Sequence, residues 1–352
     1  MSNPAMPSRC TALSRCLLAA VAGLFLSAAA AAEELVVYTA AGEADLAKIE
    51  SAYLSAHPGM SIRWERDSSA RIAQRLIDES SAPKADVVWA LAATELAGLA
   101  ERNLLLPHTP PNFAAIDAGL GDSARPPHWL GLRAWTSGIC FNPTTAAAQQ
   151  VPRPASWNDL LKPAYQGRIL MPHPGATATG YMVVANWIRQ MGEAAAWTFM
   201  DALHRNIAAY MASGTRPCTM AALTHEYPVG LSYSFLAARM QAKEEPVEAV
   251  VPREPLAWDV EGVAILRGTT RQAAAKAFVD WSVSEAADRL YKHDFAVTVR
   301  PGGPSLKHLP ADLRQRMAPT DFGWLAANRD RILTEWRRRY DEKSEPQAKR
   351  AE

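Results

Sequence analysis

Residues 85-ADVVWALAATELAGLAERN-103 place a strand pattern directly before a helix pattern. The first seven residues are a short apolar run that is typical of a buried strand, and the rest repeat apolar side chains at helical spacing. The same order occurs twice before them: 35-LVVYTA-40 precedes a helix pattern over 45–59, and 61-SIRWER-66 precedes one over 68–80. Strands that alternate with helices predict an α/β fold with a mostly parallel sheet covered on both faces.

A second set of strands and helices follows a proline-rich passage. Residues 131-GLRAWTSGICFN-142 form a strand-like run at the start of this set, and 258-WDVEGVAILRG-268 has the pattern of a returning strand. Further strands are predicted at 168–172, 229–235 and 247–252, and further helices at 193–206, 273–291 and 326–342. We therefore predict two lobes joined by two crossover strands, with lobe 1 over residues 33–134 and 264–352 and lobe 2 over residues 135–263.

The first 32 residues have the layout of a cleaved secretory signal. Arg9 and Arg15 precede the apolar run LLAAVAGLFLS, and an alanine string ends just before Glu33. This order of a basic region, an apolar region and small residues is typical of a signal peptide. We expect a signal peptide over residues 1–32 and a soluble product in the periplasm.

Composition excludes several classes of partner and chemistry. The chain carries 37 basic and 36 acidic residues, which gives no electrostatic footprint for nucleic acid. It has no nucleophile elbow, no phosphate-binding loop and no dinucleotide-binding glycine motif, and its eight histidines show no metal-ligand spacing. We expect no catalytic residue, no metal and no cofactor, and a small molecule or a protein as the partner.

Two cysteines remain after the predicted signal is removed. Cys10 and Cys16 lie within it, whereas Cys140 and Cys218 lie in the exported part. In an oxidising compartment an even number of cysteines favours one disulfide. The alternative is a pair of buried free thiols, because spacing alone does not show that the sulfur atoms meet.

Small polar residues gather after the predicted strands. In 171-MPHPGATATGYMVV-184, Thr177, Thr179 and Gly180 stand at the mouth of a helix, although capping needs only one hydroxyl. Similar groups follow other strands: Tyr38-Thr39, Asp67-Ser68-Ser69, Ala92-Ala93-Thr94 and Ser213-Gly214-Thr215. Hydroxyls and free N–H groups at helix starts suit a bound oxyanion. The alternative interpretation is that each hydroxyl caps its own helix.

Together these features resemble the substrate-binding proteins of ABC importers, in the two-lobed class that includes ferric-iron, polyamine and phosphonate binders. Within that class the sequence is similar to the 2-aminoethylphosphonate-binding family. The resemblance rests on 66-RDSSARI-72, 88-VWALAATEL-96, 132-LRAWTSGICFN-142, 156-SWNDLLKPAYQGRILMPHP-174, 179-TGYMVV-184, 191-MGEAAAW-197, 200-MDALHRNIAAYMASGTRPC-218 and 258-WDVEG-262. It implies a type II periplasmic-binding-protein fold with two crossover hinge strands, a monomer, and delivery of a phosphonate to an ABC permease. The paired cysteines also look like those of the family, which strengthens the disulfide interpretation.

The resemblance also implies a ligand site between the lobes. A phosphonate would accept hydrogen bonds from serine, threonine and tyrosine side chains, and an ammonium would meet an aromatic face and a carboxylate, with Asp259 preferred over Glu226 and Glu261. The expected ligand-binding residues are Tyr38, Thr39, Ser68, Ser69, Arg71, Ala92, Trp135, Thr177, Thr179, Gly180, Tyr181, Ser213, Tyr233, Trp258 and Asp259. Trp135 and Trp258 fall at the predicted crossings, where an indole could meet a cation or simply pack in the core.

The sequence departs from the family at points that leave other ligands open. Arg71 adds a charge near the expected anion site, and Ser232-Tyr233-Ser234-Phe235 contains one tyrosine where ferric-iron binders have adjacent tyrosines. A receptor for another small anion or for a ferric chelate is the first alternative. A secreted hydrolase on a similar α/β scaffold is the second.

Overall fold

The first part of the chain forms three parallel strands, each followed by a helix, as the sequence predicts. The computed structural model describes Met1, residues 33–302 and residues 306–346, so the predicted signal peptide lies outside the described residues. The strand–helix pairs are β1 (Glu33–Thr39) with α1 (Glu43–Ala56), β2 (Met60–Arg66) with α2 (Ser69–Asp78), and β3 (Val87–Ala92) with α3 (Ala93–Glu101). These strands lie in the order β2-β1-β3, so their carboxyl ends share one edge of the sheet.

A second group of parallel strands follows in the middle of the chain. Its strands are β6 (Ile169–Pro172), β7 (Ile207–Met211) and β8 (Val229–Tyr233), and its helices are α4 (Pro143–Ala148), α5 (Ala178–Met191), α6 (Glu193–His204), α7 (Arg216–Leu223) and α8 (Ser234–Ala242). β6 pairs in parallel with both β7 and β8. The strand expected over 229–235 ends at Tyr233, because Ser234 already begins α8.

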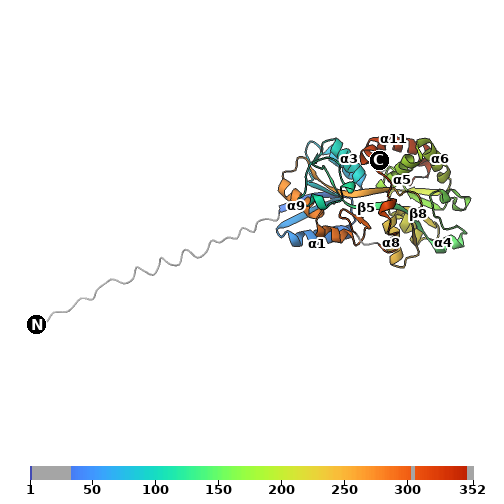
Figure 1. Ribbon diagram of the computed structural model, residues 1–352, viewed down its shortest axis with the longest axis horizontal. Coiled ribbons are helices and arrows are strands. Elements are labelled where there is room, and N and C mark those ends of the chain that lie inside the picture. The colour runs from blue at the N-terminus through green and yellow to red at the C-terminus, as the bar shows by residue number, and fades with distance from the viewer. Residues whose placement is uncertain (2–32, 303–305, 347–352) are drawn as a thin grey trace. The chain divides into compact units, whose positions relative to one another are not determined.

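Two long strands join these groups. β5 (Leu130–Phe141) and β10 (Trp258–Leu266) pair antiparallel, and β10 also pairs antiparallel with β3. The first half of β5 pairs with β10, and its second half pairs with β8 and with β9 (Glu248–Val250). The described strands thus form one mixed sheet, so the prediction of a mostly parallel sheet holds only on either side of the crossing. In Figure 1, β5 lies in the middle of the molecule, with helices α1, α3 and α9 on one side and helices α4, α5, α6 and α8 on the other.

The helix expected over 273–291 is two helices. α9 (Gln272–Ser282) ends before Ser284, whose hydroxyl accepts a hydrogen bond from Ala287 N–H and so begins α10 (Glu285–Tyr291). The short strands β4 (Leu105–Leu106) and β11 (Val297–Thr298) add to β10 and β5. α11 (Phe322–Tyr340), which was expected in lobe 1, pairs with α3 through Arg329 and Glu95. Its buried residues Ile332, Leu333 and Trp336 also pack in the same core as α5 and α6.

The disulfide links β5 to α7. Cys140 and Cys218 are bonded and fully buried, 78 residues apart in the sequence, and they pack with Ala221 and Ala237 in a small core of their own. The structure therefore favours one disulfide over two free thiols. Within residues 33–302 and 306–346, none of the helices is both long and apolar enough to cross a membrane.

Candidate ligand-binding site

The carboxyl ends of both groups of parallel strands meet at the β5–β10 crossing, and Asp259 lies at its centre. Asp259 is opposite Trp135 in the antiparallel register, and its side chain is fully buried. Its carboxylate accepts hydrogen bonds from Ala93 N–H at 3.0 Å, Val260 N–H at 2.6 Å and the Thr94 hydroxyl at 3.1 Å. Asp259 thus attaches the crossing strand to the first turn of α3.

Burial affects the pKa of Asp259 more strongly than its hydrogen bonds do. It raises the pKa of the carboxyl to about 7, although the three hydrogen bonds act in the opposite direction. A carboxyl with this pKa is partly ionised at neutral pH. A neighbouring cation would favour its charged form, so the group suits an ammonium partner.

Thr179 and Tyr233 lie across the crossing from Asp259 and face each other. A methyl group added at Gly214 would lie 2.7 Å from Thr179 Oγ1 and 2.8 Å from the Tyr233 hydroxyl, so the start of α5, the end of β8 and the β7–α7 loop meet at one point. Burial raises the pKa of Tyr233 to about 12, with the neighbouring Thr179 hydroxyl acting in the opposite direction, so the phenol stays a donor at neutral pH. Thr179 Oγ1 is buried and makes no hydrogen bond of good geometry to any described residue.

The other predicted residues of the β6–α5 junction have structural partners. Thr177 is the N-cap of α5: its hydroxyl accepts from Gly180 N–H at 3.0 Å and donates to the His173 carbonyl at 2.9 Å. Gly180 allows the helix to approach β6, because a side chain there would lie 2.5 Å from the Pro172 carbonyl. The Tyr181 hydroxyl donates to the Leu325 carbonyl of α11, so it points away from the crossing. The hydroxyls of Thr177 and Tyr181 thus both have protein partners in this structure.

The serines at the start of α2 are bound to the backbone. Ser68 caps the helix by accepting from Arg71 N–H at 3.4 Å, and Ser69 accepts from Ala92 N–H at 3.3 Å, which joins α2 to the end of β3. The Arg71 guanidinium is exposed and lies 3.9 Å from Asp67. Arg71 is therefore a surface residue in this structure.

The predicted residues of β1 and of the β7–α7 loop also bind near neighbours. Thr39 accepts from Ala41 N–H at 3.1 Å. The Tyr38 hydroxyl donates to Glu79 at 3.0 Å on the α2 side of the sheet. Ser213 accepts from the N–H groups of Thr215 and Arg216 at 3.3 Å. Each of these hydroxyls stabilises its own turn or a neighbouring helix.

The two crossing tryptophans differ in their surroundings. The Trp135 ring meets the Tyr233 ring edge to face at 5.0 Å, so it belongs to the central cluster. The Trp258 indole donates to the Ala318 carbonyl at 2.6 Å and packs against Phe322 on the other face of β10. Glu226 is exposed before the start of β8, at the end opposite to Tyr233, so it lies away from the crossing.

Sequence reasoning missed a buried ion pair at the crossing. Arg133 on β5 lies 2.5 Å from Glu261 and 3.0 Å from Asp45, with its guanidinium over the Phe295 ring. Burial alone would lower the pKa of Arg133, but the two carboxylates outweigh it and raise the pKa. Glu261 is thereby neutralised by a protein cation, which leaves Asp259 as the better candidate for a ligand amine. An arginine within an otherwise apolar strand was the signal that could have revealed this pair.

Ser137 was also missed. It lies two residues after Trp135 on β5, opposite Tyr233 in the register. Its hydroxyl is fully buried and has no hydrogen-bond partner within the described part of the chain. A single serine in an apolar strand gives no sequence signal, because only the register with β8 places it beside Tyr233.

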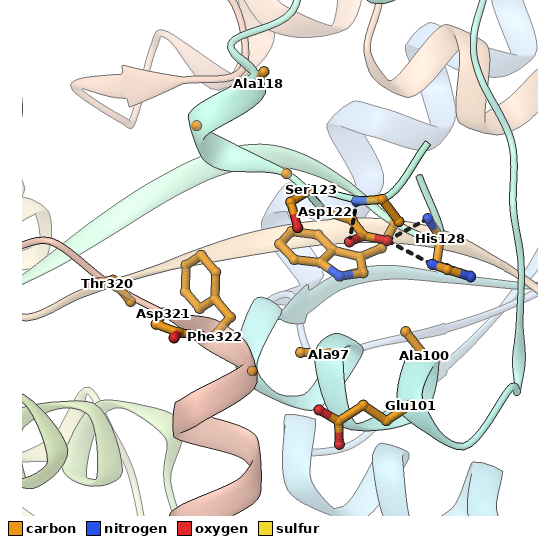
Figure 2. A pocket seen from close by; sticks show the side chains of 15 residues that line it. Ala97, Ala100, Glu101, Ala118, Asp122, Ser123, His128, Thr320, Asp321 and Phe322 are labelled. Atoms are coloured by element: carbon orange, nitrogen blue, oxygen red, sulfur yellow. Dashed lines mark hydrogen bonds and ion pairs between the residues drawn. The ribbon is translucent and has the colours of Figure 1, made fainter. Parts of the chain in front are cut away.

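Several cavities lie outside this central cluster, and two of them border α3. A cavity of about 720 Å³ is formed by α3, residues 118–129 and the start of α11 (Figure 2). Asp122 in its wall pairs with His128 Nδ1 at 2.8 Å and accepts from Ala124 N–H at 3.0 Å. A smaller cavity of about 170 Å³ borders Thr94 and contains the ion pair of Glu95 with Arg329, 3.6 Å apart. Across residues 33–302 and 306–346, no group of three or more His, Cys, Asp or Glu side chains is placed to hold a metal ion.

The sequence model of the family described as "Bacterial extracellular solute-binding protein" matches residues 82–315. The chain therefore belongs to this family. Its fold is the type II periplasmic-binding-protein fold, as the similarity to the periplasmic binding protein AfuA from Actinobacillus pleuropneumoniae shows. That structure, with exogenous fructose-6-phosphate bound, aligns with a TM-score of 0.79 and 24% identity over 88% of this chain and 99% of AfuA.

Two relatives agree with this assignment. The probable ABC transporter periplasmic-binding protein y4fP from Sinorhizobium fredii is 26% identical over 275 residues, 74% of this chain and 73% of the relative. An Fe(3+)-binding periplasmic protein from Serratia marcescens is 23% identical over 274 residues, 75% of this chain and 78% of the relative. As a member of this family the chain is an extracytoplasmic solute-binding receptor and not an enzyme. The hydrolase alternative is thus set aside.

Proposed function

We propose that this receptor binds a small ligand with a phosphonate at one end and an ammonium at the other, with 2-aminoethylphosphonate as the expected ligand. The observation that carries the proposal is the arrangement of donors and acceptor at the crossing. The hydroxyls of Thr179 and Tyr233 meet beside Gly214. The buried Asp259 is opposite Trp135 in the strand register, and the Trp135 ring meets the Tyr233 ring at 5.0 Å. Donors for an oxyanion and an acceptor for a cation therefore lie within one small region.

The helix that contains Thr179 adds to the anion end. α5 is 14 residues long and begins at Ala178, and the first N–H groups of a helix carry a partial positive charge. Thr177 occupies Gly180 N–H, so the amides of Ala178 and Thr179 are the ones available to an oxyanion. The fructose-6-phosphate reported with AfuA supports an oxyanion ligand in this fold, and it makes a phosphate ester the closest alternative.

The proposed lobes are residues 33–134 with 264–352, and residues 135–263. In this proposal they close by hinge motion about β5 and β10, the two strands that join the groups of parallel strands. Closure replaces water around the charged ligand with the fixed dipoles of both groups. α11 pairs with α3 through Arg329 and Glu95, and its buried face also packs in the core of α5 and α6, so this helix contacts both proposed lobes.

A thermal-shift panel on the full chain tests this function. The panel contains 2-aminoethylphosphonate, ethylphosphonate, inorganic phosphate, fructose-6-phosphate, putrescine and ferric citrate. A ligand present at 100 times its dissociation constant adds about 2.7 kcal/mol to the free energy of unfolding. We expect the largest shift with 2-aminoethylphosphonate. A large shift with ferric citrate or putrescine, together with no shift for any phosphonate or phosphate, would overturn the proposal.

A further inference from the structure

The residues after α11 run along the edge strand β7. Ser344 pairs in parallel with Tyr210, and Glu345 N–H donates to the Tyr210 carbonyl at 3.0 Å. Lys343 Nζ donates to the carbonyls of His204 and Ile207 at 2.5 and 2.8 Å. Because β7 is the last strand on its side of the sheet, this tail covers an edge that would otherwise be open.

The Glu345 carboxylate holds both ends of the β7–α7 loop. It accepts from Ala212 N–H at 3.2 Å and pairs with the Arg216 guanidinium at 3.1 Å. Gly214, which meets Thr179 and Tyr233, lies between these two residues. The carboxyl-terminal tail thus supplies, through Glu345, a charged group that bridges the two ends of this loop.

The same tail reaches the β6–α5 loop. Asp341 Oδ1 lies 3.5 Å from Nε2 of the fully buried His173. His173 Nδ1 accepts from the N–H groups of Gly175 and Ala176 at 3.0 and 3.2 Å, so the proton of the neutral ring is on Nε2 and faces Asp341. These bonds shape the turn that leads into Thr177 and hence into α5.

We propose that Asp341 and Glu345, on the tail that follows α11, are positioning residues for the ligand site. They brace the two loops that bring Thr179 and Gly214 together, without themselves touching the ligand. The inference concerns the site of the proposed function and so rests on it for any change in affinity. The effect of the tail on the two loops does not depend on which ligand binds.

The variant Glu345→Ala in the full chain tests this role, with Glu342→Ala as the matched control. Glu342 lies on the same tail, but its carboxylate pairs with His204 at 2.7 Å and, within residues 33–302 and 306–346, forms no hydrogen bond or ion pair with either loop. We expect faster amide hydrogen exchange over residues 212–216 in Glu345→Ala than in Glu342→Ala, with the same denaturant midpoint. Glu345→Gln keeps an acceptor for Ala212 N–H and should show a smaller increase, and it replaces Glu345→Ala if that variant does not fold.

Affinity for 2-aminoethylphosphonate is the second readout. Glu345→Ala should bind about tenfold more weakly, the equivalent of about one hydrogen bond to a charged group, while Glu342→Ala binds as the wild type does. Equal exchange of residues 212–216 in the two alanine variants overturns the inference. If wild-type protein does not bind 2-aminoethylphosphonate, the proposed function fails, but the exchange comparison still decides whether the tail braces the loop.

Discussion

The two groups of parallel strands end in similar hydroxyl-rich turns, but they use their hydroxyls differently. After β1 and β2, the side chains of Thr39, Ser68 and Ser69 all accept backbone N–H groups. After β6 and β8, Thr179 and Tyr233 face each other instead. A hydroxyl at a strand end is therefore a candidate ligand donor only when helix capping has not already used it.

Helix position explains the difference. Thr177 and Ser68 are N-cap residues, whose side chains reach the N–H groups of the first turn. Thr179 is the second residue of α5, and a side chain there has no free helical N–H in reach. Two threonines two positions apart in the same motif are therefore expected to serve different purposes, one in stability and one in binding.

The largest expected effect follows from removing the two facing hydroxyls. The double variant Thr179→Val with Tyr233→Phe keeps the shapes of both side chains and deletes two donors to the proposed oxyanion. Each lost hydrogen bond to a charged group costs about 1.5–3 kcal/mol, so affinity for 2-aminoethylphosphonate should fall by at least about a hundredfold. Isothermal titration calorimetry measures this loss, and the melting temperature of the unliganded protein should hardly change.

The matched control is Ser68→Ala with Thr39→Val at the ends of β1 and β2. This pair removes hydroxyls that are already bonded to backbone N–H groups, so it should lower stability and leave affinity close to wild type. If the two double variants lose affinity equally, the two groups of strands do not use their hydroxyls differently.

Much of the fold could be predicted from the sequence because local patterns determine it. The runs 35–40, 61–66 and 85–91 are short, apolar and flanked by helix patterns, and each forms a strand close to the predicted bounds. The sequence did not reveal where 273–291 breaks, because the periodicity continues through Ser284, whose bond to Ala287 N–H begins a second helix. It also gave no sign that α11 packs with α5 and α6, since that depends on tertiary contacts.

The site was less predictable than the fold. The sequence places hydroxyls at strand ends, but it does not show which partner each hydroxyl finds. Tyr181 and Trp258 were expected at the ligand, yet Tyr181 donates to the Leu325 carbonyl and Trp258 donates to the Ala318 carbonyl. Each partner is at least 60 residues away in the sequence. Ser137 and Arg133 reach the crossing through strand register, which a single sequence does not contain.

We expect an intermediate loss of affinity when Asp259 is substituted. This substitution tests the amine end of the site separately from the oxyanion end. Asp259→Asn keeps an acceptor for Ala93 N–H but loses the charge. Binding of 2-aminoethylphosphonate should weaken, whereas ethylphosphonate, which has no amine, should bind weakly to both proteins. The double difference in binding free energy from calorimetry should be about 1–3 kcal/mol. A coupling near zero would make Asp259 a structural carboxylate that only holds α3.

The pH dependence of the same carboxyl provides a second measurement. Its pKa rises from 3.8 to about 7 on folding, so the folded state binds more protons between these values. The contribution of Asp259 to stability is therefore fully present below the lower value and is lost as the pH rises through the upper one, with a slope of at most about 1.4 kcal/mol per pH unit. A bound ammonium would lower this pKa, so binding near pH 6 should release a proton, and Asp259→Asn should abolish that release.

The smallest change is expected for Thr177→Val, which can be compared with Thr179→Val in the same helix turn. Thr177→Val removes the cap of α5, which accepts from Gly180 N–H, and the hydrogen bond to the His173 carbonyl. Loss of an N-cap costs about 1 kcal/mol, so chemical denaturation should show a fall in the free energy of unfolding of about that size. Thr179→Val alone should show the opposite pattern, with weaker ligand binding and little change in unfolding, because its hydroxyl caps nothing. If Thr177→Val weakens binding as strongly as Thr179→Val, then both threonines contact the ligand and the first helix turn does not separate capping from recognition.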